Sequence, residues 1–440
     1  MTILKHLLKL TPVAAACALP LAALATNGMN MEGYGPVSTG MGGASQAIDH
    51  GTAAMAQNPA TLSLMAPGAR FDAAFGVLGP DVASSMPGMP TAESDGTSYV
   101  MPAFGYARRS GALTYGIGLF AQGGMGTEYA ADTFLALGSG RDVRSELGVG
   151  RVLLPLTYQV TPEFAVGGTL DFMWAGLDLR MAATGAQLGG LVTGASGNLG
   201  AALPALGGAP WARIDFSNDN DFTGEAASTG WAAKLGAVWR PMPTLTFGAS
   251  YQFESSLGDM ETSDNGASLS AAGGFVDYGR ITVVDFQWPS MTAVGLAWQA
   301  TPTVLLAADY KRIGWSNVMK DFKMRFDSAG VGGSVSFALP QNWEDEDVVN
   351  LGVAWAVNSA LTLRAGVSLS DNPIPDAYVN PLFPATEEDH YTLGFGYRFS
   401  PAHDFNASMT IAPEVKVTNG QGVVITHEQL NFQFMYTYRF

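Results

Sequence analysis

The chain has 440 residues, of which 47% are hydrophobic and 14% are charged. Beyond residue 25 it contains no run of eighteen apolar residues, which excludes a helical membrane protein. The formal net charge of −16, without a cluster of Lys and Arg, argues against a nucleic acid as partner.

Residues 1–25 predict a cleaved secretory signal peptide. Lys5 and Lys9 precede an apolar run, and Ala23-Leu24-Ala25 provides an A-x-A cleavage site. The alternative is a lipoprotein signal acylated at Cys17, which the cleavage site that follows disfavours. Because Cys17 is the only cysteine, the mature chain is expected to have neither disulfides nor thiol chemistry.

Residues 26–66 predict a compact segment without regular strands. The stretch is rich in Gly, Met and small residues and has only weak periodicity. It is too apolar for a solvated tail and too irregular for a strand. Asn58-Pro59-Ala60 lies near its end, where an ordinary Asx-Pro turn is one explanation of the motif.

Residues 67–440 predict an all-β membrane protein, a 14-stranded antiparallel transmembrane β-barrel. High hydrophobicity without long apolar runs must be spread as alternation of apolar and polar residues, as in lipid-facing strands. Turns of two to four residues alternate with longer Gly- and Asp-rich loops, as in outer-membrane barrels with periplasmic short turns. The predicted strands are 68–80, 97–109, 112–124, 143–160, 163–181, 223–240, 244–260, 278–300, 303–320, 345–357, 360–371, 388–400, 403–416 and 427–440.

Such a ring needs something to fill it. Fourteen strands spaced about 4.8 Å and tilted by about 40° make a ring about 28 Å across, too wide for wall side chains alone to fill. We therefore expect residues 26–66 to form an N-terminal hatch inside the lumen. The longest loop, about 182–222, is expected to carry a short helix over the barrel mouth. The acidic runs 344–347 and 387–389 are expected at solvated extracellular strand ends, with divalent cations beside lipopolysaccharide as the alternative.

The last predicted strand carries the strongest barrel signal. Phe432, Tyr436 and Tyr438 share one face with the terminal Phe440, while the other face is mostly polar. Aromatic residues at both ends of an apolar face favour a strand that faces lipid over a strand of a soluble sandwich. A carboxy-terminal Phe also resembles the assembly signal of bacterial outer-membrane proteins, so the outer-membrane assembly machinery is an expected partner.

Four motifs in the same order as in a known family carry a further resemblance. They are Asn58-Pro59-Ala60, Gly126-Thr127-Glu128-Tyr129, Trp315-Ser316 in the predicted ninth strand, and Asp371-Asn372-Pro373-Ile374-Pro375. With the terminal Phe, they make the chain resemble the FadL family of outer-membrane transporters. That family carries long-chain fatty acids and, in related branches, toluene, xylene and other hydrocarbons.

The resemblance implies a route for the transported molecule. In the family the hatch, which ends at the motif matched by Asn58-Pro59-Ala60, blocks direct passage to the periplasm. The ligand leaves sideways through a wall opening where the third strand kinks inward. The matching stretch here is Ala121-Gln122-Gly123-Gly124-Met125, in which glycines allow a close approach of the backbone. The alternative is that Gly123-Gly124 merely ends the strand.

The resemblance weakens where fatty-acid members place basic residues. Gly176 and Glu344 occupy those positions here. A buried carboxylate without a cationic partner is costly, so a neutral hydrocarbon or aromatic is an alternative to a fatty acid. The remaining cations that are candidates for the lumen and the substrate are Arg151, Arg180, Lys234, Lys311 and Arg364.

These features predict uptake of long-chain fatty acids or other hydrophobic compounds by a monomeric, multi-pass barrel in the bacterial outer membrane. Neither a cofactor, a metal site nor an enzymatic activity is expected, because catalytic motifs are missing and the His residues lie far apart. A diffusion porin for small polar solutes is the first alternative, although an apolar plug does not suit it. An outer-membrane protease or phospholipase is the second, with only His390 or His427 to supply a base.

Overall fold

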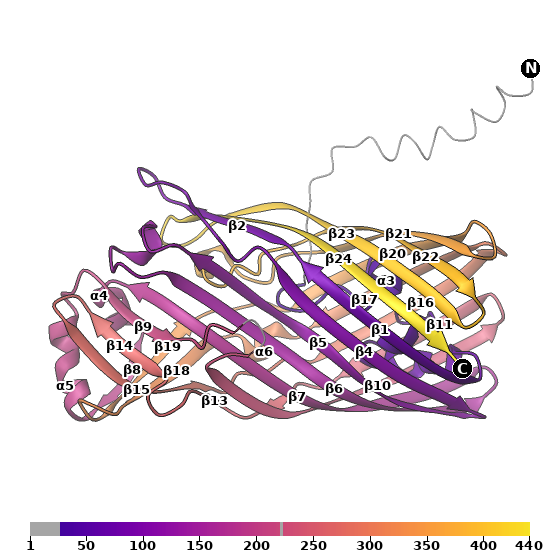
Figure 1. The fold of residues 1–440 in the computed structure, drawn as a ribbon, viewed down its shortest axis with the longest axis horizontal. Coiled ribbons are helices and arrows are strands. Elements are labelled where there is room, and N and C mark those ends of the chain that lie inside the picture. Colours follow the sequence, from indigo (N-terminus) through magenta and orange to yellow (C-terminus); the bar gives the residue numbers. More distant parts are fainter. Residues whose placement is uncertain (1–26, 221–222) are drawn as a thin grey trace, which may run out of the picture.

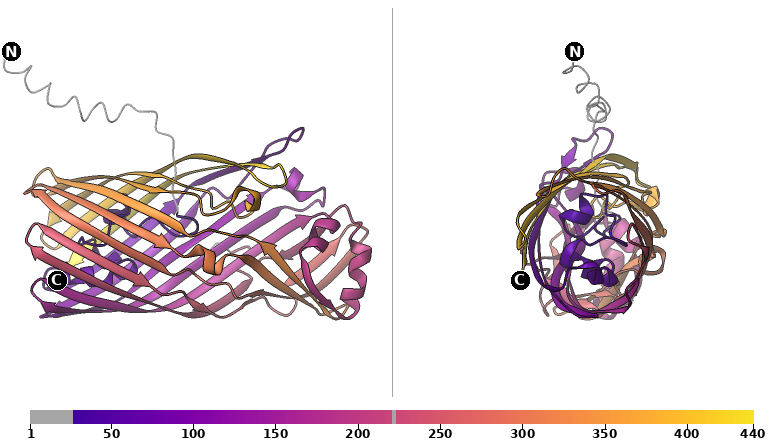
Figure 2. Two further views of the ribbon diagram at one scale, coloured as in Figure 1. Left: turned by 180° about the vertical axis from the view of Figure 1, so that it is seen from behind. Right: turned by 90° about the vertical axis from the view of Figure 1, so that its right-hand side faces the viewer.

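The computed structural model describes residues 27–220 and 223–440, whose strands form one antiparallel sheet closed into a barrel (Figures 1 and 2). The predicted signal peptide, with Cys17, lies outside the described residues. Within those residues no helix is both long and apolar enough to cross a membrane.

The closed ring of strands begins with β1 (Gly68–Leu78) and ends with β24 (Val424–Arg439), which pairs back with β1. Hydrogen-bonded pairing runs between consecutive members of the ring, and every pair is antiparallel. Between β1 and β24 lie, in order, β4 (Tyr99–Ser110), β5 (Leu113–Tyr129), β6 (Val143–Thr161), β7 (Phe164–Ala183), β10 (Ala226–Met242), β11 (Leu245–Gln252), β16 (Met291–Thr301), β17 (Val304–Ile313), β20 (Glu346–Ala356), β21 (Leu361–Ser370), β22 (His390–Ser400) and β23 (His403–Thr418).

Over the described residues the sheet contains 24 strands, more than the fourteen expected. The additional strands lie in the long loops, where frequent Gly and Asp residues hide their alternation. Most of them gather at the end of the barrel opposite the short turns, where they lengthen the wall (Figure 1). They are β2 (Pro80–Ser85), β3 (Ala92–Glu93), β8 (Val192–Ser196), β9 (Ala212–Phe216), β12 (Ser256–Leu257), β13 (Met260–Glu261), β14 (Ala267–Ala271), β15 (Phe275–Val284), β18 (Asp321–Ser328) and β19 (Ser334–Pro340).

Three further predictions concern the loops. The predicted helix within 182–222 is confirmed by α4 (Gly185–Gly190) and α5 (Gly197–Leu206), at the same end of the barrel as β8. The predicted strand 278–300 is wrong in part, because it joins β15 to β16 across a break. Trp315-Ser316 lies in the short helix α6 (Trp315–Val318) rather than in a strand, because the chain turns after β17.

The outer face of the ring is apolar, as the alternation predicts. On β22, Leu393, Phe395 and Tyr397 are exposed, whereas His390 and Thr392 are buried inside the barrel. The same parity holds on β24, where Phe432 and Tyr436 are exposed and alternate with buried polar residues. Side chains of this kind suit contact with lipid and make the lumen the polar side of each strand.

The N-terminal segment, residues 27–65, lies inside the ring (Figure 2, right). It contains one short α-helix and two 3-10 helices, and nearly all of its residues are buried. Its apolar side chains pack against inward-facing residues of the wall, such as Phe120 on β5 and Ala297 on β16. The helices are α3 (Pro36–Thr39), η1 (Gly51–Ala56) and η2 (Pro59–Leu64).

Candidate functional site

The Asn58-Pro59-Ala60 turn ties the N-terminal segment to the wall. Asn58 caps η2, because its side-chain oxygen accepts a hydrogen bond from Ala60 N at 3.1 Å. Its amide nitrogen donates to Gln46 O at 2.8 Å and to Ala237 O of β10 at 3.2 Å. The motif is therefore an Asx-Pro turn that also joins two parts of the N-terminal segment to the barrel.

Three of the five predicted cations donate to carbonyl groups of the N-terminal segment. Lys311 Nζ lies 2.9 Å from Glu32 O and 3.3 Å from Gly43 O. Lys234 Nζ donates to Ala56 O, and Arg151 Nη2 lies 3.2 Å from the same oxygen. These side chains are fully buried or nearly so, so their donors serve backbone groups that water does not reach. That they also bind a ligand stays a prediction.

The other two cations lie apart from these three. Arg364 Nη1 donates to Asn406 Oδ1 at 3.0 Å. Arg180, near the end of β7, pairs with Asp142 at 2.8 Å and with Asp219 at 2.7 Å. Burial raises the pKa of the Asp142 carboxyl, but the hydrogen bond and charge of Arg180 outweigh it and leave that pKa below its usual value. The charge of Arg180 is therefore already neutralised by ion pairs with two carboxylates.

Gly176 and Glu344 stand at the two positions where the family resemblance leads us to expect basic residues. A Cβ at Gly176 would lie 2.5 Å from Gly224 N, so a long side chain does not fit there without a shift of the backbone. Glu344 lies in the turn before β20, where its N–H donates to Pro373 O at 2.8 Å. Neither position supplies a cation to the lumen.

The wall is interrupted between β4 and β5. These strands pair from Ser110–Leu113 only as far as Phe104–Leu119. Beyond Phe104, β4 continues to Tyr99 in pairing with β1, and β5 continues to Tyr129 in pairing with β6. No pairing among the described residues joins the two strands along this stretch, which we call the gap. Pro102, which has no N–H to donate, lies on the unpaired edge of β4.

The predicted kink, Ala121–Met125, lies where β5 departs from β4. The register with β6 shifts between Ala121 and Gly123, and Gly123 forms an isolated bridge with Asn30 of the N-terminal segment. Gln122 Nε2 donates to Asn30 Oδ1 at 2.8 Å, and Tyr34 Oη donates to Gln122 O at 2.7 Å. The alternative that Gly123-Gly124 ends the strand is wrong, because β5 runs on to Tyr129.

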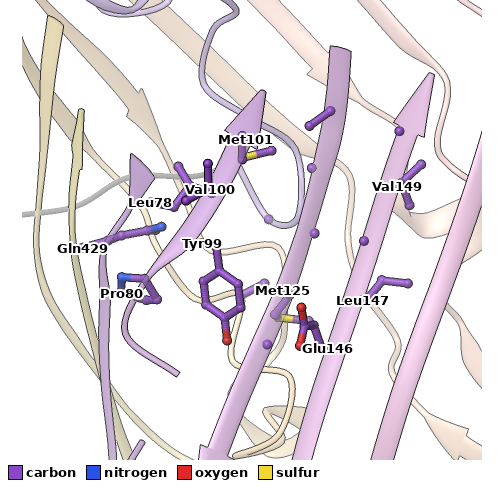
Figure 3. Close-up of a pocket in the computed structure, with 18 of the residues that line it drawn as sticks. Leu78, Pro80, Tyr99, Val100, Met101, Met125, Glu146, Leu147, Val149 and Gln429 are labelled. Carbon is purple, nitrogen blue, oxygen red and sulfur yellow. The ribbon is translucent and has the colours of Figure 1, made fainter. Parts of the chain in front are cut away.

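A cavity of about 250 Å³ opens at the gap (Figure 3). It reaches from Gly28 of the N-terminal segment to Trp174 on β7, and most of its lining is apolar. Its lining includes two carboxylates, those of Glu146 and Glu387, but neither Arg nor Lys among the described residues. Its larger apolar side chains come from five strands of the ring and are Leu78, Val100, Met101, Leu119, Met125, Leu147, Val149 and Trp174.

A loop between β21 and β22 folds into the barrel beside this cavity. Tyr129 Oη and Thr127 Oγ1 each donate to Pro381 O at 3.1 Å, and Ser145 Oγ donates to Leu382 O. Two residues of the Gly126-Thr127-Glu128-Tyr129 motif, Thr127 and Tyr129, thus bind the loop to the end of β5. The sequence did not reveal this insertion, because the loop carries no alternation and its partners are more than 200 residues away.

The expectation that both acidic runs are solvated is wrong for one residue of each. Glu387 is 2% exposed and lies inside the barrel because its loop is inserted there. Glu346 is also 2% exposed and accepts a hydrogen bond from Trp315 Nε1 at 3.2 Å. The other residues of the two runs are exposed or half-buried, and at Glu388 burial and then the nearby carboxylates raise the pKa. Over the described part of the chain, acidic and His residues do not gather into a metal site.

The terminal Phe440 lies on the outer face of the ring, 61% exposed. Its ring stacks on Tyr438 with centroids 5.2 Å apart. Its backbone N–H and C=O both bond to Ala69 at the start of β1, at 3.0 and 2.8 Å. The last residue thus takes part in closing the barrel.

Comparison with known proteins finds similar outer-membrane transport proteins. Residues 13–437 match the family described as outer membrane protein transport protein (OMPP1/FadL/TodX). A stretch of 77 residues is 47% identical to an uncharacterized protein of Chlorobium limicola encoded in the 5′ region of a phosphoenolpyruvate carboxykinase gene. This match covers 17% of the chain and 37% of that protein.

Solved structures give whole-chain matches. The P. putida toluene transporter TodX is 32% identical with a TM-score of 0.83, over 93% of this chain and 99% of that one. The Ralstonia pickettii toluene transporter TbuX is 30% identical with a TM-score of 0.78, over the same shares. A Pseudomonas aeruginosa FadL homologue, 16% identical with a TM-score of 0.70 over 95% of this chain and 99% of that one, shares the fold. The chain therefore belongs to the OMPP1/FadL/TodX family of outer-membrane transport proteins, and it is an outer-membrane channel for hydrophobic compounds rather than an enzyme.

Proposed function

We propose that this channel carries neutral hydrophobic molecules of about the size of one substituted ring, and that they leave the barrel sideways through the gap between β4 and β5. The observation that carries the proposal is the coincidence of two features in one place. The wall lacks strand pairing beyond Phe104, and a mostly apolar cavity, lined by neither Arg nor Lys among the described residues, opens at that position. A molecule in this cavity can pass from the lumen towards lipid over a lining that is mostly apolar.

The size of the cavity supports a ring rather than a long chain. An engineered apolar cavity of about 150 Å³ holds one benzene molecule, so about 250 Å³ has room for a ring with small substituents. The chain's similarity to two proteins described as toluene transporters supports the same substrate class.

The charges of the lumen favour a neutral ligand over a fatty acid. Arg151, Lys234 and Lys311 already donate to the N-terminal segment, and the cavity itself is lined by the carboxylates of Glu146 and Glu387. A buried carboxylate ligand there would lose its hydration without gaining a cationic partner. Long-chain fatty acids thus become the weaker of the two predicted substrate classes.

Residues 26–66 act in this proposal as the hatch that blocks straight passage. The segment has direct hydrogen bonds to the wall through Asn58, Lys234 and Lys311. The fourteen strands of the ring from β1 to β24 would form the membrane-spanning wall around it. A blocked lumen disfavours the diffusion porin, because polar solutes have no wide path through it.

The protein is proposed to work as a monomer. Its exposed apolar belt suits lipid on all sides of the ring, with lipopolysaccharide beside the acidic rim around Glu388. Phe440, which closes the sheet against β1, is the proposed signal for the outer-membrane assembly machinery.

Competition binding tests the ligand class. Purified protein in lipid nanodiscs would be offered p-xylene against palmitate and its methyl ester at neutral pH, with empty nanodiscs to correct for partition into lipid. We expect saturable binding of p-xylene and no preference for palmitate over its ester. A preference for the acid above about tenfold, or about 1.4 kcal/mol, would contradict the proposal and make Arg180 the first residue to replace.

A further inference from the structure

One end of the cavity is polar, and the polar side chains there are deeply buried. Glu387, His427 and Gln429 all line the cavity and are 2%, 5% and 5% exposed. They come from two parts of the chain, the inserted loop before β22 and the first half of β24. Figure 3 shows the Gln429 side chain extending towards Leu78 and Val100, so its amide faces apolar side chains of the cavity.

His427 forms an ion pair with one carboxylate oxygen of Glu387, and the other oxygen has no hydrogen-bond partner among the described residues. His427 Nε2 lies 3.0 Å from Glu387 Oε1, and its Nδ1 lies 2.7 Å from Pro384 O. The second carboxylate oxygen, Glu387 Oε2, is buried without a hydrogen-bond partner among the described residues, and so is Gln429 Oε1. Both atoms are acceptors, so they require a donor from elsewhere.

A plain hydrocarbon in the cavity would leave these acceptors unsatisfied. A buried polar atom without a partner destabilises the complex, and an apolar ligand that displaces water from such atoms does not replace the lost hydrogen bonds. A carboxylate ligand would be worse, because it offers no proton and meets the negative charge of Glu387. The lining therefore suits an apolar body that carries one hydrogen-bond donor.

We propose that the cavity prefers a hydroxylated monoaromatic molecule, of the phenol class, whose hydroxyl donates to Glu387 Oε2 or Gln429 Oε1 while its ring lies against Leu78 and Met101. A hydroxyl also accepts, so the amide nitrogen of Gln429 can donate to the same group. This inference rests on the proposed function and narrows its substrate class from ring-sized hydrophobic molecules to those with a hydroxyl on the ring.

The test compares two ligands of nearly equal shape, p-cresol and p-xylene, which differ by a hydroxyl in place of a methyl group. Binding to the full protein in nanodiscs would be measured at pH 7 for each compound and corrected for partition into empty nanodiscs. One added hydrogen bond predicts a preference for p-cresol of about three- to tenfold. Equal binding of the two, or a preference for p-xylene, would overturn this inference and leave the proposed function standing.

Variants then locate the preference. Gln429→Met removes an acceptor while keeping the length of the side chain, and Glu387→Met removes the other acceptor. Gln433→Met is the matched control, because Gln433 is buried on the same strand but does not line this cavity. We expect either cavity variant to reduce the ratio of p-cresol to p-xylene affinity at least threefold, and the control to keep it.

Two results would contradict this account in different ways. If both cavity variants keep the full preference, the hydroxyl is bound elsewhere and the inference fails. If neither compound binds saturably to the unmodified protein, the proposed function fails and the inference fails with it. Heat-modifiable gel mobility would be recorded for every variant, and Gln429→Met decides the matter if Glu387→Met does not form a barrel.

Discussion

At the level of single residues, buried donors and close backbone contacts hold the N-terminal segment inside the ring. Lys311 and Lys234 each donate to backbone oxygens of that segment, so two cations of the wall act on its carbonyl groups. On β11, a Cβ at Gly248 would lie 1.6 Å from Gln46 O, so the segment and the wall are in direct backbone contact. A substitution at one of these contacts should therefore shift the position of the whole N-terminal segment.

Gly248→Ala should loosen the N-terminal segment. The added methyl group would overlap Gln46 O, and the backbone of the segment would have to move to accept it. We expect more frequent or larger open-channel events in planar bilayers than in the unmodified protein. Gly148→Ala is the control, since a Cβ at Gly148 meets nothing within 4 Å. Equal channel activity in both variants and in the unmodified protein would show that this contact does not seat the segment.

At the level of elements, the departure of β5 from β4 defines the site. The unpaired edge of β4 contains Pro102, and the unpaired part of β5 turns to the N-terminal segment through the bridge between Gly123 and Asn30. Backbone groups freed from one ladder are costly in a membrane unless they find partners inside the protein. The bridge at Gly123 and the hydrogen bond from Tyr34 Oη to Gln122 O supply such partners.

Valine at two different glycines should separate closure of the gap from a change in the N-terminal segment. A Cβ at Gly123 would lie 2.1 Å from Met29 O, so Gly123→Val must displace the segment or straighten β5. Gly148→Val meets open space and only narrows the cavity that it lines. We expect both variants to reduce uptake of p-xylene by cells several-fold, with conductance altered only by Gly123→Val. Undiminished uptake in both would count against passage through the gap.

The strands of the ring could be predicted from the sequence because lipid outside and polar groups inside impose a strict two-residue period. On β22 and β24 that period marks each outward side chain correctly, and the inward orientation of Lys234 and Lys311 follows from the same parity. The extra strands, such as β18 and β19, were not predicted, because these loops carry frequent Gly and Asp residues.

The partners of the inward-facing residues could not be predicted. Lys311 binds carbonyl oxygens, which any residue carries, so the sequence gives no sign of them. The burial of Glu387 depends on the inserted loop and on His427, which is 40 residues away on β24. Alternation orients a side chain towards the lumen but does not say which segment fills the lumen at that height.

At the level of the whole molecule, a wide ring and a buried N-terminal segment together leave the gap as the proposed way out. Deletion of residues 27–65 should therefore turn the channel into a wide pore. A ring of strands about 28 Å across, once emptied of this segment, would conduct ions freely, because only inward-facing wall side chains remain. Single-channel recordings in planar bilayers should show a sharp rise in conductance. Porin-like conductance of the intact protein would contradict the role of the segment as a hatch.

The most direct test of sideways passage is a reversible block at the gap. Ala121 lines the cavity on β5, and Ala308 lies on the outer face of β17, away from the gap. Ala121→Cys would be modified with benzyl methanethiosulfonate, and uptake of p-xylene by cells would be measured before modification, after it, and after reduction with dithiothreitol. Sideways exit predicts a several-fold loss of uptake that reduction restores, with no loss in the equally modified Ala308→Cys. Unchanged uptake by the fully modified Ala121→Cys protein would contradict exit through the gap.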